Sequence, residues 1–413
     1  MGFAADRGRV LARLVVAITA MLAGAGLIAA ATPAIAGAAS SDSGPSARST
    51  KVHHARTPPR RKHAAPRKRK RAKRVLPLKM IWGPFTLPDG SSAFPTYHQL
   101  GVQVLQLQLI WAQTAPARPG EPTNPADPAY RWPPELEQAI SQAAHYGIAL
   151  AVLVKGTPAW ANGGQDPSWA PNNAADYANF LEAASRRYPT IHYWMIWGEP
   201  SGKFNFNPMP PRSPVGPRRY ALLLDAAYGA LKAVSRSNIV IGGMTWSAGE
   251  VSPPEFIRWM RLPNGAPPRL DYYGHNPYST RFPNLAEGPM PALGGFLHTG
   301  GGIRDINDID TLHGELAVAY RHRRGGAPKL WLSEFSISSD SPNRAFNFFV
   351  SRVGQAHWLT AAFKLVDSVS YVAGLGWYDL MDEPTSIPEH LTEGLLTAED
   401  TPKPAFNAYA RAP

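Results

Sequence analysis

Two glutamates, far apart in the chain, each occupy an apolar segment of strand length. Glu199 closes the run 191–200, I-H-Y-W-M-I-W-G-E-P, and Glu334 lies in the run 329–338, K-L-W-L-S-E-F-S-I-S. Runs that are apolar on both faces are typical of strands buried in a parallel sheet. A single carboxylate at such a strand end is compatible with a simple rim salt bridge. Two carboxylates brought together form the pair that glycoside hydrolysis requires, one to protonate the departing oxygen and one to attack or stabilise the sugar carbon.

The elements that must position these carboxylates alternate along the chain. We expect eight strands, at 79–85, 101–111, 148–155, 191–200, 238–246, 270–279, 329–338 and 368–380. Helices are expected at 133–146, 174–188, 217–235, 254–261, 310–323, 344–366 and 404–411. This alternation predicts an α/β fold, a (β/α)8 TIM barrel, in which the ends of the fourth and seventh strands face each other across the active-site end. A doubly wound open sheet is the alternative, and the lack of a glycine-rich phosphate loop after any strand disfavours it.

Five short phrases occur in order at the predicted strand ends. They are T-P-A-W-A after the third strand, I-W-G-E-P after the fourth, H-N-P-Y after the sixth, W-L-S-E-F on the seventh and G-W-Y on the eighth. Together they resemble the clan A retaining glycoside hydrolases, in particular family 39-like barrels, with family 5-like barrels as a second match. The resemblance covers about residues 79–380, nearly the whole predicted folded body.

The resemblance implies catalytic roles for particular residues. Glu199 matches the acid/base and Glu334 the nucleophile of a double-displacement reaction. Tyr278 matches a tyrosine that donates its hydroxyl to the nucleophile, although a bond to backbone is the alternative. Trp377 matches the tryptophan that floors the reacting subsite, where sugar faces stack on an indole, with a core position as the alternative. His275, near Tyr278, is a candidate to bond a carboxylate or a sugar hydroxyl, or to make a structural hydrogen bond.

Three further residues are candidates for substrate binding. Trp160 and Trp111 follow the third and second strands and are expected to flank neighbouring subsites or to pack in the core. Asn162, in the loop after the third strand, is expected to contact a sugar hydroxyl or to be a solvated loop amide.

The chain departs from the family pattern at two positions. Gly198 stands where clan A proteins place an asparagine that contacts the sugar 2-hydroxyl, and Gln106 stands where the family places an arginine beside the nucleophile. An uncharged neighbour leaves the pKa of Glu334 less depressed. These departures are compatible with an unusual substrate or with a barrel that binds glycans without cutting them.

The N-terminal part of the chain has a different composition. Residues 1–36 carry arginines, an apolar run and an A-I-A site, the pattern of a signal peptide, so we expect the protein to be secreted, extracellular or associated with the cell envelope. An uncleaved membrane anchor is the alternative. Residues 37–75 form a predicted disordered linker rich in Pro, Ala, Lys and Arg, and 51–74 hold 12 basic and no acidic residues.

The positive charge of the chain is concentrated in that linker. None of the formal net charge of +12 comes from the predicted catalytic domain 76–413, because residues 75–413 contain 26 bases and 28 acids and are nearly neutral at about −2. We therefore expect the linker to contact anionic wall polymers or lipid headgroups, and we expect no specific nucleic acid partner. A linker without such a function is the other interpretation.

Composition also limits the cofactors. The chain has no cysteine, which excludes disulfides and thiolate metal or nucleophile sites. No metal and no other cofactor is predicted, because two carboxylates hydrolyse a glycoside without an ion. The acidic group Asp305, Asp308 and Asp310 lacks the spacing of a calcium loop and is interpreted as a solvated helix start.

The sequence thus predicts a monomeric, secreted retaining glycosidase acting on a polysaccharide or oligosaccharide. The alternatives are a catalytically inactive glycan-binding barrel tethered to the cell envelope, and a basic-tailed adhesin whose barrel is only a scaffold.

Overall fold

The structure, a computed structural model, describes residues 76–285, 302–343 and 348–413. The predicted signal peptide and basic linker lie outside these ranges, as do residues 286–301 of the Gly- and Pro-rich connection and 344–347 of the predicted helix 344–366. Among the helices of the described ranges, none has the length and apolar character needed to span a bilayer.

Eight parallel strands form a closed barrel in which each strand pairs with its neighbours in sequence and β1 pairs with β8. The strands are β1 (Leu78–Trp82), β2 (Val104–Ile110), β3 (Ala149–Lys155), β4 (Tyr193–Ile196), β5 (Ile239–Trp246), β6 (Tyr272–Asn276), β7 (Lys329–Phe335) and β8 (Val372–Trp377). The predicted (β/α)8 TIM barrel is therefore confirmed.

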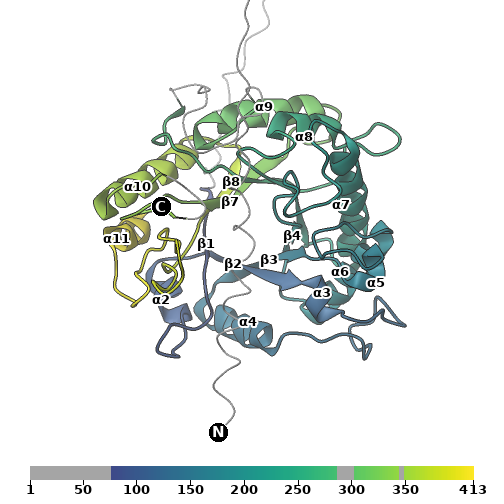
Figure 1. Cartoon of the computed structure of the whole chain (residues 1–413), viewed down its shortest axis with the longest axis horizontal. Coiled ribbons are helices and arrows are strands. Elements are labelled where there is room, and N and C mark those ends of the chain that lie inside the picture. Colours follow the sequence, from purple (N-terminus) through teal and green to yellow (C-terminus); the bar gives the residue numbers. More distant parts are fainter. Residues whose placement is uncertain (1–75, 286–301, 344–347) are drawn as a thin grey trace, which may run out of the picture. The chain divides into compact units, whose positions relative to one another are not determined.

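Helices surround the ring of strands, as Figure 1 shows. They are α2 (Phe94–Gln99), α3 (Trp111–Thr114), α4 (Pro134–Tyr146), α5 (Ala159–Asn162), α6 (Ala174–Arg187), α7 (Val215–Val234), α8 (Pro253–Trp259), the 3-10 turn η2 (Ile306–Asp308), α9 (Ile309–Ala319), α10 (Arg352–Ser368) and α11 (Pro404–Arg411). The sequence prediction missed α2, α3, α5 and η2. Each of these is short, so its pattern carries little helical periodicity.

The period of two in each strand divides the core into two parts. The inward-facing set includes Met80, Leu153, Met195 and Trp331 and fills the barrel. The outward-facing set, together with the apolar sides of the helices, forms the larger core between sheet and helices. Burial on both faces explains why the strands are apolar throughout.

Gly376 on β8 permits a close approach inside the barrel. A Cβ at this position would lie 2.1 Å from the carbonyl oxygen of Ser333 and 2.4 Å from Nε2 of Gln106. That carbonyl oxygen accepts hydrogen bonds from Gln106 Nε2, at 2.7 Å, and from Trp82 Nε1, at 2.9 Å. Side chains on β1 and β2 thus tie β7 to the two strands on the far side of β8.

The C-terminal helix closes the seam between β1 and β8. Tyr409 on α11 donates its hydroxyl to the carbonyl oxygen of Met80, at 2.9 Å. The ammonium of Lys79 donates to the carbonyl oxygen of Ala412, at 3.0 Å. The first strand and the last helix are therefore joined directly.

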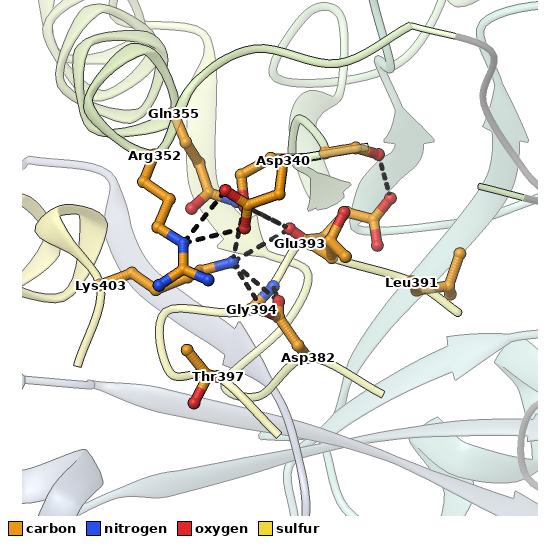
Figure 2. A network of polar contacts seen from close by, with 12 residues as sticks. Asp340, Arg352, Gln355, Asp382, Leu391, Glu393, Gly394, Thr397 and Lys403 are labelled. Carbon is orange, nitrogen blue, oxygen red and sulfur yellow. Dashed lines mark hydrogen bonds and ion pairs between the residues drawn. The ribbon is translucent and has the colours of Figure 1, made fainter. Parts of the chain in front are cut away.

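A buried polar network holds the segments that follow β7 and β8 (Figure 2). Lys403, 1% exposed, pairs with Asp382 at 2.8 Å and donates to the carbonyl oxygen of Thr392. The carboxylate of Glu393 accepts from the Ser338 hydroxyl at 2.6 Å. These contacts fix the two loops beside the carboxyl ends of their strands.

The predicted solvated acidic helix start is wrong in one respect. Asp305 and Asp308 do stand at the start of η2 and α9, but both are buried and pair with Arg281, at 2.5 and 2.8 Å. An arginine from the loop after β6 provides the counter-charge that allows two carboxylates to be buried.

Candidate active site

Glu199 and Glu334 lie at the same end of the barrel. Glu334 is the second-to-last residue of β7, and Glu199 follows β4 by three residues. Both residues are half-buried. Glu199 has a backbone φ of 45° and Trp197 one of 66°, in the left-handed region that residues other than glycine seldom adopt. Strain of this kind persists where the surrounding structure fixes a functional side chain.

One amide acts on both carboxylates. Asn276, the last residue of β6, donates its amide to Glu199 Oε1 at 3.0 Å. Ser333 donates its hydroxyl to Oδ1 of Asn276 at 2.6 Å, which orients the amide nitrogen towards Glu199. The same amide helps to lower the pKa of Glu334, so both carboxylates lie near it.

Two further side chains donate hydrogen bonds, one to each carboxylate. Tyr278, in the segment after β6, donates its hydroxyl to Glu334 Oε2 at 2.9 Å. Asn205, in the segment between β4 and α7, donates its amide to Glu199 Oε2 at 3.3 Å. Donors to a carboxylate favour its ionised form and fix its direction.

Burial dominates the electrostatics of the pair. Burial and, next, the charge of Glu199 raise the pKa of Glu334 to about 8, while Tyr278, Lys155 and Asn276 act in the opposite direction. Burial also raises the pKa of Glu199, against the Asn276 hydrogen bond and the charge of Lys155. Carboxyls this close ionise one after the other, so the pair retains one proton at neutral pH.

His275 does not contact either carboxylate, so its predicted catalytic role is wrong. The ring is fully buried, its Nε2–H donates to the carbonyl oxygen of Arg304 at 2.7 Å, and its Nδ1 accepts from the Thr245 hydroxyl at 2.9 Å. Burial lowers the pKa of His275 to about 4, so the ring is neutral and holds the segment around Arg304 to the barrel.

Trp377 faces away from the barrel interior, which contradicts its predicted place as a subsite floor. The indole is fully buried in the core between sheet and helices, and its Nε1 donates to the carbonyl oxygen of Glu393 at 3.0 Å. The next residue, Tyr378, packs against the barrel-interior residues and is partly exposed. Burial, the charge of Asp379 and then that of Glu334 raise the pKa of Tyr378. At this strand end it is therefore Tyr378, and not Trp377, that faces the barrel interior.

Two other predicted substrate contacts are also wrong. Trp111 is fully buried and packs edge-on to Trp160, with ring centroids 5.6 Å apart. Asn162 is buried and makes its hydrogen bonds within its own loop, where its amide donates to the carbonyl oxygens of Gln165 and Asp166 at 3.1 and 3.0 Å.

Trp160 itself is partly exposed. Its Nε1 donates to the carbonyl oxygen of Ala115 at 2.8 Å, and the guanidinium of Arg118 lies 4.5 Å from its ring. A contact between Trp160 and a bound sugar stays a prediction.

At the two positions where the chain departs from the family pattern, the structure shows what surrounds Gln106 and Gly198. Gln106 is fully buried inside the barrel, and its Oε1 accepts from Trp331 Nε1 at 3.0 Å, so it does not bond to Glu334. At Gly198 the missing side chain leaves room that is bordered by Leu153 and by the stem of Lys155.

The sequence analysis missed several residues of this site. Asn276 lies inside the quoted phrase H-N-P-Y, and Tyr378 ends the phrase G-W-Y, but their neighbours were chosen instead. Lys155 continues the inward-facing set of Ala151 and Leu153 on β3, and this period of two was a usable signal. Asn205 lies in an irregular segment and carried no such signal.

Within the described ranges, no group of three or more His, Asp or Glu side chains is arranged to hold a metal ion. The site consists of acid, amide, phenol and ammonium groups, which bind and move protons and donate hydrogen bonds.

No family model and no curated protein matches the sequence. Solved structures do match. A family 39 glycoside hydrolase from the gut symbiont Bacteroides cellulosilyticus WH2 superposes with a TM-score of 0.58 at 20% identity, over 81% of this chain and 63% of that one. A glucosidase from Croceicoccus marinus gives 0.57 at 15% identity, over 81% and 65%.

A third match is a monomeric beta-xylosidase from Caulobacter crescentus CB15, with a TM-score of 0.51 at 16% identity, over 77% of this chain and 62% of that one. The chain thus spans less than two thirds of the length of each of these three proteins. At these identities the similarity shows a shared barrel fold.

Proposed function

We propose that this protein is a secreted retaining glycoside hydrolase that cleaves O-glycosidic bonds of a polysaccharide or oligosaccharide by double displacement. The observation that carries the proposal is the pair Glu199 and Glu334 beside the amide of Asn276, at the carboxyl end of a (β/α)8 barrel. We propose retention because this amide helps to lower the pKa of both carboxyls, which favours a close pair. Retaining enzymes hold their two carboxyls about 5–5.5 Å apart, whereas inverting enzymes need about 6.5–9.5 Å to admit a water molecule.

The proposed reaction has two steps. In the first, the Glu334 carboxylate attacks the anomeric carbon while Glu199 gives its proton to the departing oxygen, which leaves a glycosyl ester on Glu334. In the second, Glu199 accepts a proton from water, the water oxygen attacks the same carbon, and Glu334 is released. Tyr278 stabilises Glu334 in its ionised form, and Asn276 holds the carboxylate of Glu199.

The test begins with a panel of aryl glycosides and polysaccharides. On any substrate that is cleaved, the Glu334→Ala and Glu199→Ala variants are expected to lose nearly all turnover. Azide is expected to restore turnover of an activated aryl glycoside to both variants, and the configuration of the product distinguishes them. Glu199→Ala should give a glycosyl azide of retained configuration, because azide replaces water on the glycosyl ester without needing a general base. Glu334→Ala should give one of inverted configuration, because azide attacks the anomeric carbon from the place of the missing carboxylate. The first hydrolysis product of the wild type, observed by NMR, should keep the anomeric configuration of the substrate. An inverted product from the wild type would refute double displacement, and full turnover by either variant without azide would refute the role of that residue.

A second function is favoured by one specific observation. Among the residues that the structure describes, no arginine or lysine makes an ion pair with Glu334, and burial with the charge of Glu199 raises its pKa to about 8. A protonated Glu334 is a poor nucleophile, which fits a glycan-binding barrel without hydrolysis. Such a protein would retain polysaccharide in a pull-down and release no reducing ends from the same panel.

The N-terminal segments are assigned by composition. We propose that the signal sequence directs export and that the basic residues 51–74 attach the protein to anionic wall polymers or lipid headgroups. Deleting 51–74 should abolish binding to such polymers while leaving the rate on a soluble glycoside unchanged. Binding that survives the deletion would refute the attachment.

A further inference from the structure

Lys155 brings an ammonium group near the two carboxylates. It is the last residue of β3 and continues the inward-facing set of Ala151 and Leu153. Burial lowers the pKa of Lys155, and the charges of Glu199 and Glu334 act in the opposite direction. Among the described residues, however, none accepts a hydrogen bond from its Nζ or lies within the 4.0 Å of an ion pair.

Gly198 gives this lysine its room. A Cβ at Gly198 would lie 3.3 Å from Leu153 Cδ1 and 3.9 Å from Lys155 Cδ, so the stem of Lys155 borders the space that a side chain at position 198 would fill. Because Gly198 directly precedes Glu199, the ammonium is held on the side of the site next to that carboxylate. A side chain longer than that of alanine at position 198 would compete with Lys155 for this space.

The charges at the site explain why a ligand is needed. With one proton on the carboxyl pair, the pair carries one negative charge, and a protonated Lys155 carries one positive charge. Positive charge then develops on the sugar ring in an oxocarbenium-like transition state, close to an ammonium that has no contact partner among the residues described by the structure. An acidic group on the bound sugar would supply that partner and offset the added charge.

We infer that Lys155 selects a glycoside with an acidic substituent on the sugar bound at the site, such as the carboxylate of a uronic acid or a sulfate ester. This inference rests on the proposed hydrolysis and specifies its substrate class. Lys155 is then a specificity-determining residue that contacts substrate.

The test compares matched pairs of 4-nitrophenyl glycosides that differ only in the acidic group: glucoside with glucuronide, galactoside with galacturonide, and glucoside with glucoside 6-sulfate. In at least one pair the acidic member is expected to have a kcat/KM about ten-fold or more above the neutral member. Any effect of Lys155 on the two carboxyls is shared by both members of a pair, so the quantity compared is the acidic-to-neutral ratio of kcat/KM. Lys155→Met should lower this ratio by about 10- to 100-fold, the effect of losing one charge-assisted hydrogen bond. Lys364→Met, which removes an exposed lysine on α10, is the matched control.

A binding measurement separates this inference from the proposed reaction. Calorimetric titration of the wild type with free glucuronate or galacturonate, against glucose or galactose, should show tighter binding of the acid, and Lys155→Met should remove that difference. If no glycoside is cleaved but this pattern holds, hydrolysis fails and the acidic-sugar inference stands. If acidic members are not preferred in rate or binding, or if Lys155→Met weakens acidic and neutral members equally, Lys155 serves only the carboxylates and the inference is overturned.

Discussion

Tyr278 offers a direct test of how the carboxyl pair shares its proton. Its hydroxyl donates to Glu334 Oε2 at 2.9 Å, and Tyr278→Phe removes this donor without changing the ring. A hydrogen bond to a charged group contributes about 1.5–3 kcal/mol, and one pKa unit corresponds to about 1.4 kcal/mol. The pKa of Glu334, already raised to about 8 by burial and by the charge of Glu199, should therefore rise by about 1–2 units.

Two measurable effects follow for an enzyme that is active with Glu334 ionised and Glu199 protonated. A higher pKa of Glu334 moves the shared proton from Glu199 to Glu334, so the active form becomes about 10- to 100-fold rarer and kcat/KM falls by that factor. The second proton is also lost at higher pH, so the alkaline limb of the pH profile should move upward from about pH 8.

The assay is kcat/KM between pH 4 and pH 10 on any aryl glycoside that the wild type cleaves. Tyr320→Phe is the matched control, because it removes another buried hydroxyl, one that donates to the carbonyl oxygen of Pro268 at 3.2 Å away from the carboxyl pair. The control should keep the wild-type profile. A loss of rate in Tyr278→Phe with an unmoved alkaline limb would refute the reasoning, since Tyr278 would then act on the substrate and not on Glu334.

Three further predictions concern stability. Burial first, and then the charge of Glu199, keep the pKa of Glu334 above its ordinary value of 4.5, so the folded state binds a proton that the unfolded state does not, and its stability falls as pH rises towards about 8. Glu334→Gln should therefore raise Tm by several degrees at pH 8, and the gain should shrink towards pH 4.5. A gain in Tm that does not depend on pH would contradict this account. Lys403→Met leaves the buried Asp382 carboxylate without its ion partner and should cost about 3–5 kcal/mol in urea unfolding, with partial recovery in the double variant that adds Asp382→Asn. Gly376→Ala places a Cβ 2.1 Å from a backbone carbonyl oxygen of β7 and should abolish or severely weaken folding. The control Gly314→Ala, on α9 with no atom within 4 Å of its Cβ, should be neutral or stabilise the protein by about 0.5–1 kcal/mol. A Gly376→Ala protein that folds with full stability would refute the packing argument.

The order of strands and helices could be predicted because a parallel barrel buries both faces of each strand. Continuous apolar runs separated by amphipathic segments then mark the elements directly. The helix at Pro404–Arg411 has the predicted bounds, and the strand ending at Lys155 begins one residue later than predicted. Boundaries were poorer at the eighth strand, which was predicted to be longer at both ends.

The direction of individual side chains was harder to predict than the elements that carry them. Before Trp377, β8 contains two glycines, at 374 and 376, which have no side chain and so do not mark a face. The indole was therefore assigned to the site when Tyr378, one position on, faces inward, because a shift of one residue reverses the face. His275 was similarly chosen over Asn276 for its chemistry, although the latter holds the contact to Glu199.

The hydrogen bond between Tyr409 and Met80 spans 329 positions of the chain. During synthesis, β1 is made among the first parts of the domain, yet its partner β8 and the helix that covers their junction are made last. Until then β1 presents an unpaired edge to other molecules, and edges of this kind promote aggregation. Completion of the ring therefore waits for the last part of the chain to leave the ribosome, and cellular chaperones that shield the early strands are expected to set the yield of folded protein.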